Sequence, residues 1–131
     1  MDKRPINPWT WQDALGFAQA YEVGPAKRTL VCSGQTSVDA KGVPLHEGDM
    51  AAQIRQAIAN LETVLGAAGF GLGDVVRLNY YTTDVDAFIQ GAAGGMGRLI
   101  ETGCRPASTL LGVARLFHPK ILVEIEATAM V

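Results

Sequence analysis

The sequence predicts an α+β fold of order ββαβαββ, with the helices packed on one face of a mostly antiparallel sheet. Three observations support this prediction. Apolar residues follow helical spacing after residue 49 and alternate near the C-terminus. Residues 75–83 are rich in strand-forming side chains, and the predicted helices fall between predicted strands. The 131 residues are enough for one domain with its own hydrophobic core. We therefore expect a single domain over residues 1–131.

The first third predicts a leader followed by two extended runs. Residues 1–16 show no regular pattern, and we expect an irregular N-terminal leader there. The runs Phe17–Val23 and Thr29–Val38 follow, and Gly24-Pro25 between them is a typical turn signal. We therefore expect these two runs to form a hairpin. Residues 39–47 contain a glycine and a proline and predict a loop.

The first helix is the best-defined element of the chain. Asp49 is a suitable N-cap residue, because its side chain can accept a hydrogen bond from the first turn. Apolar residues then recur at spacings that place them on one helix face: Ile54, Ile58, Leu61 and Leu65. Gly69 is expected to end the helix, since glycine readily adopts the left-handed conformation of a C-terminal cap.

The second half predicts a strand over 75–83, a helix and two final strands. Asp84 is expected to cap the helix, which extends to about Thr102 and contains four glycines. Each glycine costs about 1 kcal/mol relative to alanine, so this helix is short, broken or held mainly by packing. The last strands are predicted over Ser108–Leu116 and Ile121–Met130. The exposed face of the sheet then needs a cover, which an oligomer would supply.

Composition argues against several classes of function. The net charge is −2, with 11 basic and 13 acidic residues, so we expect no nucleic-acid partner. No apolar run approaches the ~18 residues of a membrane span, and the N-terminus has no apolar signal core. Two cysteines and two histidines without short-range partners predict no disulfide framework and no metal site. We expect a cytoplasmic protein.

The last strand contains two carboxylates on one face. Glu124 and Glu126 are two residues apart, so both side chains point the same way. Such a pair can serve as acid, base or water-positioning groups if burial shifts their pKa values. The alternatives are a solvated face or an ion pair with Arg115 or Lys120.

Two further positions suggest ligand contacts. Arg105 precedes a proline and is expected to be extended, so its guanidinium could bind a ligand carboxylate or remain a surface charge. Gly34 lies within the second extended run, where glycine indicates a bulge, a close approach by a ligand or a simple strand irregularity. The sequence contains no nucleophile-elbow motif, so it does not predict a catalytic triad.

Several segments together resemble the Rid family, also called the YjgF or L-PSP endoribonuclease-like family. They are Ser33-Gly34-Gln35, Ala51–Gln56 with Asn60-Leu61, Ala67-Ala68-Gly69, Gly73–Val76, Val113–Leu116 and Val123–Ala127. The resemblance extends from about residue 17 to 130. It implies a chorismate-mutase-like fold of the bacillary type and a homotrimer with small-molecule clefts between subunits. The best-known branch hydrolyses enamines and imines, such as 2-aminoacrylate, without a cofactor.

The resemblance assigns roles to particular residues. The family's water-positioning glutamate corresponds to Glu124, whereas its carboxylate-binding arginine is replaced by Ser108. A serine hydroxyl supplies neither the charge nor the fork geometry of a guanidinium, so the chain resembles a branch that lacks this arginine. We expect Ser108, Gly34, Arg105 and Phe17 to contact the ligand. Arg105 would need a bend near Pro106 to reach the same cleft.

Three hypotheses follow. The first is a trimer that binds a neutral or weakly polar metabolite between subunits and hydrolyses an imine, enamine or related C–N bond, with Glu124 holding water. The second is a non-catalytic trimer that senses a small molecule or a partner protein. The third is an endoribonuclease, which the acidic charge balance disfavours.

Overall fold

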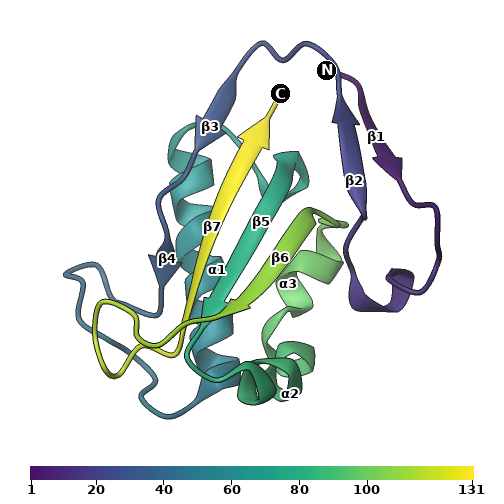
Figure 1. The fold of residues 1–131 in the computed structure, drawn as a ribbon. Helices are drawn as coiled ribbons and strands as arrows, with labels where there is room; N and C mark the ends of the chain where they lie inside the picture. Colours follow the sequence, from purple (N-terminus) through teal and green to yellow (C-terminus); the bar gives the residue numbers. More distant parts are fainter.

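Five strands form one sheet, and three helices lie on one of its faces (Figure 1). The computed structural model describes residues 1–131. The sheet has the strand order β3-β7-β5-β6, and β4 also pairs with β7. Its strands are β3 (Thr29–Val31), β4 (Gln35–Thr36), β5 (Val75–Thr82), β6 (Ala107–Gly112) and β7 (Val123–Met130). The predicted α+β class is confirmed.

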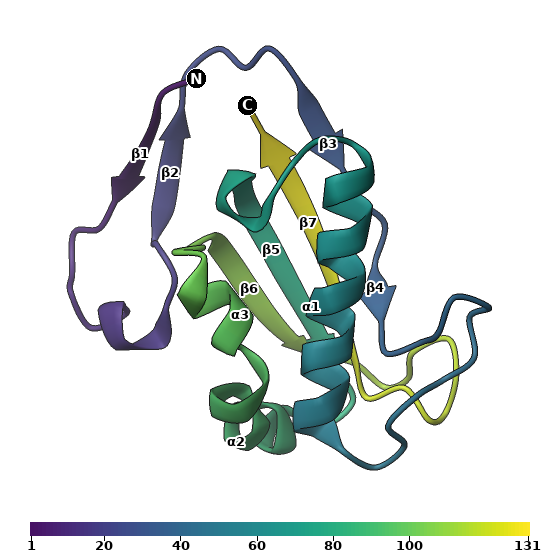
Figure 2. The same cartoon turned by 180° about the vertical axis from the view of Figure 1, so that it is seen from behind.

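The three helices form one layer on one face of the sheet, and Figure 2 shows this layer in front of the strands. They are α1 (Met50–Ala67), α2 (Val85–Gly95) and α3 (Gly97–Glu101). Two short 3₁₀ helices, η1 (Asp13–Leu15) and η2 (Leu72–Asp74), lie in the connections. None of the helices combines the length and apolar composition that a membrane crossing requires. The other face of the sheet has no covering layer within the chain.

The helix α1 forms as its sequence predicts. The Asp49 carboxylate accepts a hydrogen bond from the Ala52 backbone N–H at 3.1 Å, so the predicted N-cap is confirmed. The predicted apolar stripe is buried to 1% exposure or less: Ile54, Ile58, Leu61 and Leu65. Gly69 has a φ of +78° and ends the helix in the left-handed conformation. This stripe covers the apolar face of the sheet and supplies much of the core.

The glycine-rich second helix is broken at Met96 into α2 and α3. Packing explains its glycines, because a Cβ added at Gly95 would come within 2.7 Å of the Ile54 side chain. Gly91 lies similarly close to Met50, at 3.2 Å from its Cγ. The absence of side chains therefore lets α2 approach α1 closely. Of the alternatives that the sequence leaves open, a broken helix held by packing is the one observed.

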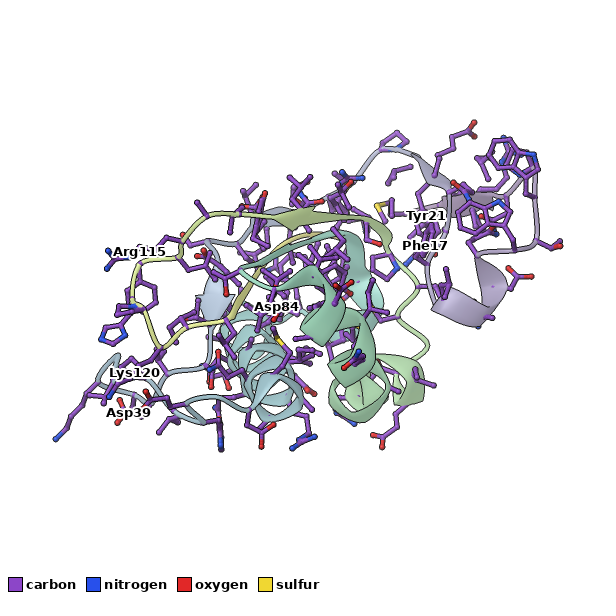
Figure 3. The ribbon with its side chains drawn as sticks, turned by 60° about the horizontal axis from the view of Figure 1, so that its bottom comes forward. Phe17, Tyr21, Asp39, Asp84, Arg115 and Lys120 are labelled. Carbon is purple, nitrogen blue, oxygen red and sulfur yellow. The ribbon has the colours of Figure 1, made fainter.

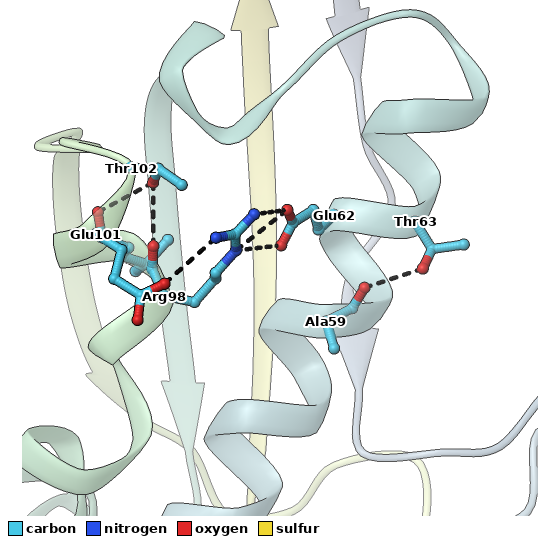
Figure 4. Close-up of polar contacts among 7 residues, drawn as sticks. Ala59, Glu62, Thr63, Arg98, Glu101 and Thr102 are labelled. Atoms are coloured by element: carbon cyan, nitrogen blue, oxygen red, sulfur yellow. Dashed lines mark hydrogen bonds and ion pairs between the residues drawn. The ribbon is translucent and has the colours of Figure 1, made fainter.

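An ion pair also holds the helix layer together. Arg98 of α3 donates three hydrogen bonds to the Glu62 carboxylate of α1, at 3.0 Å and 3.2 Å from Nε and at 2.6 Å from Nη2 (Figure 4). Glu101 accepts a fourth hydrogen bond from the same guanidinium at 3.3 Å. Because these side chains are partly or largely exposed, solvent screening keeps the contribution of the ion pair to stability small.

Strand pairing places two kinds of residue on the two faces of β7. On the helix-covered face, apolar residues are buried to 3% exposure or less: Val123, Ile125, Ala127 and Ala129. Their neighbours on the open face are only partly buried. β7 runs antiparallel to β5 and β3, whereas β5 and β6 run parallel because α2 and α3 connect them. The predicted alternation in the last strand is confirmed.

The N-terminal third differs from the prediction. Within the expected leader, β1 (Lys3–Ile6) is a strand that pairs antiparallel with β2 (Ala20–Val23) in a separate sheet. β3 pairs instead with β7, so the predicted hairpin between the runs 17–23 and 29–38 is wrong. The Gly24-Pro25 signal marks a change of direction, but a turn signal alone does not determine which strands pair.

Two predicted strands are shorter than expected. The run 29–38 is interrupted between β3 and β4, so Gly34 lies in an irregular segment rather than within a continuous strand. The strand predicted over 108–116 ends at Gly112, where an added Cβ would come within 2.9 Å of Val85. Residues 113–122 instead form a loop that leads into β7.

Candidate functional site

Glu124 lies on the open face of the sheet, directly against the backbone of Gly34. In the β7 pairings, Glu124 is in register with Thr36 on β4 and Tyr81 on β5. A Cβ added at Gly34 would lie 2.1 Å from the Glu124 Oε1 atom. Any larger residue at position 34 would therefore displace the carboxylate. The close approach that glycine indicated is made by a side chain of the protein itself.

Two effects change the acidity of Glu124. Partial burial raises its pKa above the ordinary value, and the nearby Glu126 carboxylate raises it further. Neither Glu124 nor Glu126 forms an ion pair; Lys120 instead pairs with Glu47 at 3.5 Å. The predicted alternative of an ion pair with Arg115 or Lys120 is therefore wrong. A carboxylate with a raised pKa and no cationic partner can exchange protons with a ligand or water.

Glu126 has a different environment from Glu124. The Tyr81 hydroxyl donates a hydrogen bond to the Glu126 carboxylate, and the Asn79 amide donates another at 3.3 Å. Glu126 is the main reason that the pKa of Tyr81 is raised. These bonds hold Glu126 in place and leave Glu124 as the carboxylate without a hydrogen-bonding side chain. Tyr81 and Asn79 were missed by sequence reasoning, although their alternation on a predicted strand places them on one face.

Ser108 faces away from Glu124. Its partner in the parallel pairing is Leu78, which is fully buried on the helix-covered side. The next residue, Thr109, accepts a hydrogen bond from Arg77 at 2.8 Å on the open face. Because neighbouring strand residues point to opposite faces, Ser108 points toward the helix side. One chain therefore does not bring Ser108 and Glu124 together.

Phe17 and Arg105 meet at a third location, in a pocket of about 400 Å³. We call it the arm pocket, and its lining residues are Pro5, Asn7, Asp13, Phe17, Ala18, Tyr21 and Arg105. Arg105 precedes β6 and turns toward the N-terminal segment, where its Nη1 donates to the Asp13 carbonyl at 3.0 Å. Figure 3 shows Phe17 and Tyr21 at one end of the molecule and Arg115 and Lys120 at the other.

The remaining reactive side chains form no second centre. Both cysteines are free and buried, and burial raises the pKa of the Cys104 thiol to about 11. Cys104 is therefore a neutral thiol at physiological pH and a poor nucleophile. No group of three or more His, Cys, Asp or Glu side chains is arranged to hold a metal ion.

Comparison with known proteins identifies relatives across almost the whole chain. The model of the endoribonuclease L-PSP family matches residues 12–131. A RutC family protein of Pyrococcus horikoshii is 32% identical over 127 residues, covering 96% of this chain and 89% of that protein. A 2-iminobutanoate/2-iminopropanoate deaminase of Salmonella typhimurium is 35% identical over 120 residues, covering 89% of each chain.

Solved structures show the same fold. A conserved Rid family protein of Yersinia pestis superposes with a TM-score of 0.85 at 36% identity, covering 100% of both chains. The Escherichia coli protein TdcF, whose structure contains bound serine, superposes with a TM-score of 0.71 at 26% identity, covering 88% of this chain and 87% of that one. Sequence, fold and family model agree, and the chain belongs to the Rid/YjgF family, described by the model as endoribonuclease L-PSP.

Proposed function

We propose that this protein hydrolyses an imine, an enamine or a related C–N bond of a small metabolite, with Glu124 positioning the attacking water. The observation behind this proposal is the Glu124 carboxylate, which lies over Gly34, has a raised pKa and forms no ion pair. Two relatives named as 2-iminobutanoate/2-iminopropanoate deaminases, at 35% and 34% identity, support the same reaction type.

The chemistry requires one group that both accepts and donates a proton. As a water oxygen attacks the C=N carbon, the Glu124 carboxylate accepts a proton from that water. The resulting carboxylic acid then returns this proton to the nitrogen, which gives a carbinolamine. Glu124 next accepts the hydroxyl proton of the carbinolamine and donates it to the nitrogen as the C–N bond breaks and the C=O bond forms, which releases ammonia and a carbonyl compound. A raised pKa suits both steps, because the two protonation states of Glu124 are closer in energy near neutral pH. This reaction needs no cofactor.

The site is proposed to lie between subunits of a homotrimer. Glu124 and Gly34 face the open side of the sheet, whereas Ser108 faces the helix side across β5. A second subunit, docked on the open face, would bring its own β6 edge toward Glu124. The cleft would then combine Glu124 and Gly34 of one subunit with Ser108, Phe17 and Arg105 of its neighbour. The uncovered sheet face supports such an assembly.

The reducing cytoplasm is the proposed location of this reaction. Both cysteines are free, buried thiols. Free buried cysteines are usual in reducing compartments.

The test is release of ammonia and a 2-keto acid from 2-imino acids generated in solution. We expect activity in the wild type, its loss in Glu124→Gln, and no change in Glu47→Gln, a matched exposed glutamate. Ser108→Arg should increase activity toward substrates with a carboxylate, because a guanidinium can bind it with two hydrogen bonds. Unchanged activity in Glu124→Gln would contradict the catalytic role. If neither the wild type nor Ser108→Arg releases ammonia, the result would favour the alternative of a non-catalytic binding protein.

A further inference from the structure

The open face of the sheet holds two carboxylates with unequal surroundings. Glu126 accepts hydrogen bonds from the Tyr81 hydroxyl and from the Asn79 Nδ2 atom, the latter at 3.3 Å. Tyr81 is in register with Glu124 in the pairing of β5 with β7, yet its hydroxyl reaches past Glu124 to the next carboxylate along β7. The hydrogen bonds therefore distinguish two residues of the same type.

The Asn79 amide is oriented by the charge of Glu126. Asn79 is in register with Glu126, and its Nδ2 atom donates to the carboxylate. Its Oδ1 atom is buried and has no hydrogen-bond partner. The reverse orientation of the amide would direct this oxygen at the carboxylate, where two acceptors would repel each other. Asn79 thus keeps its donor on Glu126 although this leaves its own acceptor unsatisfied.

No positive charge offsets the two carboxylates. The residues that adjoin Glu124 on the side of β4 are uncharged, with Thr36 in register and Gly34 against Oε1. Arg77 of β5 donates instead to the Thr109 hydroxyl at 2.8 Å. Neither carboxylate takes part in any of the four ion pairs of the chain. Two like charges on one face of a strand repel each other, which favours a proton on one of them.

We propose that Tyr81 and Glu126 are positioning residues, which hold a fixed negative charge beside Glu124 and make Glu124 the carboxylate that takes up and releases the proton. Two carboxylates in different environments can divide these roles. Burial and the Glu126 charge both raise the pKa of Glu124, in agreement with this division. The role rests on the proposed hydrolysis, because the proton concerned is the one that Glu124 exchanges with water and substrate.

The experiment measures the pH dependence of ammonia release from 2-iminopropanoate generated in solution. Because Glu124 must be ionised to accept a proton from water, the rate should rise with pH through the pKa of Glu124. Glu126→Gln removes the neighbouring charge, so this rise should move to lower pH. Its maximal rate should fall by less than about tenfold, whereas Glu124→Gln should lose about 10²–10⁴-fold, the usual contribution of general acid–base catalysis.

A second variant tests the tyrosine hydroxyl alone. Tyr81→Phe keeps the ring but removes the hydrogen bond to Glu126, which frees that carboxylate to turn toward solvent. The rise in rate should move in the same direction as in Glu126→Gln, but less far. Tyr80→Phe is the matched control, because it removes a hydroxyl from the buried face of the same strand and should leave the pH profile unchanged. Glu126→Asp retains the charge and should restore part of the wild-type profile.

NMR titration of the Glu124 carboxyl carbon provides a readout that requires no activity. Glu126→Gln and Tyr81→Phe should both lower the titration midpoint of Glu124, and Tyr80→Phe should not change it. An unchanged midpoint in Glu126→Gln, or equal changes in Tyr81→Phe and Tyr80→Phe, would overturn the positioning role.

The two readouts separate this role from the hydrolysis on which it rests. Intact hydrolysis with an unshifted pH profile in Glu126→Gln would contradict the positioning role and leave the hydrolysis standing. If the wild type releases no ammonia, the hydrolysis is contradicted. The midpoints of Glu124 alone then support or overturn the effect of Tyr81 and Glu126 on its proton.

Discussion

The two faces of β7 belong to one strand but have different roles. On the helix-covered face, Val123 and Ile125 are fully buried against the helix layer. On the open face, Glu124 and Glu126 are partly buried, and no element of the chain covers them. The comparison teaches that the covered face provides stability, whereas the open face can hold polar groups that would destabilise a core. Substitutions on the two faces should therefore have different consequences.

The largest expected effect is loss of stability on the covered face. Ile125→Ala removes a fully buried side chain and should lower the free energy of unfolding by about 2–5 kcal/mol. Its neighbour variant Glu124→Gln should change that free energy by less than about 1 kcal/mol. Urea denaturation at one fixed protein concentration measures both. Similar losses in the two variants would contradict the division between the faces.

The next effect concerns packing between α1 and α2. Gly95→Ala places a Cβ 2.7 Å from Ile54 and should cost about 1–3 kcal/mol through overpacking. Gly97→Ala is the control, because no atom lies within 4 Å of its added Cβ. Thermal unfolding of both variants provides the measurement. Equal stability of the two would show that α2 can move away from α1 without cost.

Substitution of Gly34 should have a smaller effect on stability but should change the pKa of Glu124. Gly34→Ala places a methyl group on the present position of the Glu124 carboxylate, which must move outward. The carboxylate should become better solvated, so the raised pKa of Glu124 should fall toward its ordinary value. NMR titration of the Glu124 carboxyl carbon measures this change. An unchanged titration would mean that Gly34 does not determine the carboxylate position.

The smallest effects are opposite pH dependences on the two sides of the sheet. Because the pKa of Glu124 is raised in the folded state, this group stabilises the folded protein below about pH 4.5. That stabilisation is lost as the pH rises through the raised pKa. The hydrogen bond from Arg98 lowers the pKa of Glu62, so Glu62 stabilises the folded protein above about pH 4.5. That stabilisation is lost as the pH falls through the lowered pKa.

Denaturation of the two variants across pH tests this contrast. Relative to wild type, Glu124→Gln should gain stability as pH rises from about 4 to about 7, and Glu62→Gln should lose stability over the same interval. Each change should be below about 1 kcal/mol, since both groups are partly exposed. The same sign of pH dependence in both variants would contradict the pKa directions.

Local patterns predicted the elements whose signals lie within one segment. The stripe of α1 and the alternation of β7 follow from spacing, because each element repeats its own burial pattern. The pairing of β1 with β2 and of β3 with β7 was not predicted, since pairing depends on contacts between distant segments. For the same reason the sequence suggested Glu124 and Gly34 separately but not their contact. The contact of Arg105 with Asp13 likewise depends on the N-terminal segment 1–16, for which the sequence shows no regular pattern.

Mixing two inactive subunits tests most directly whether the open face completes a site with its neighbour. Glu124→Gln and Ser108→Trp would be expressed separately and together with different tags, and the mixed oligomers would be isolated and assayed for ammonia release. Each variant alone should be inactive, and the mixed oligomers should recover activity because some clefts combine an intact Glu124 with an intact Ser108. Activity no greater than that of the separate variants would contradict a cleft shared between subunits.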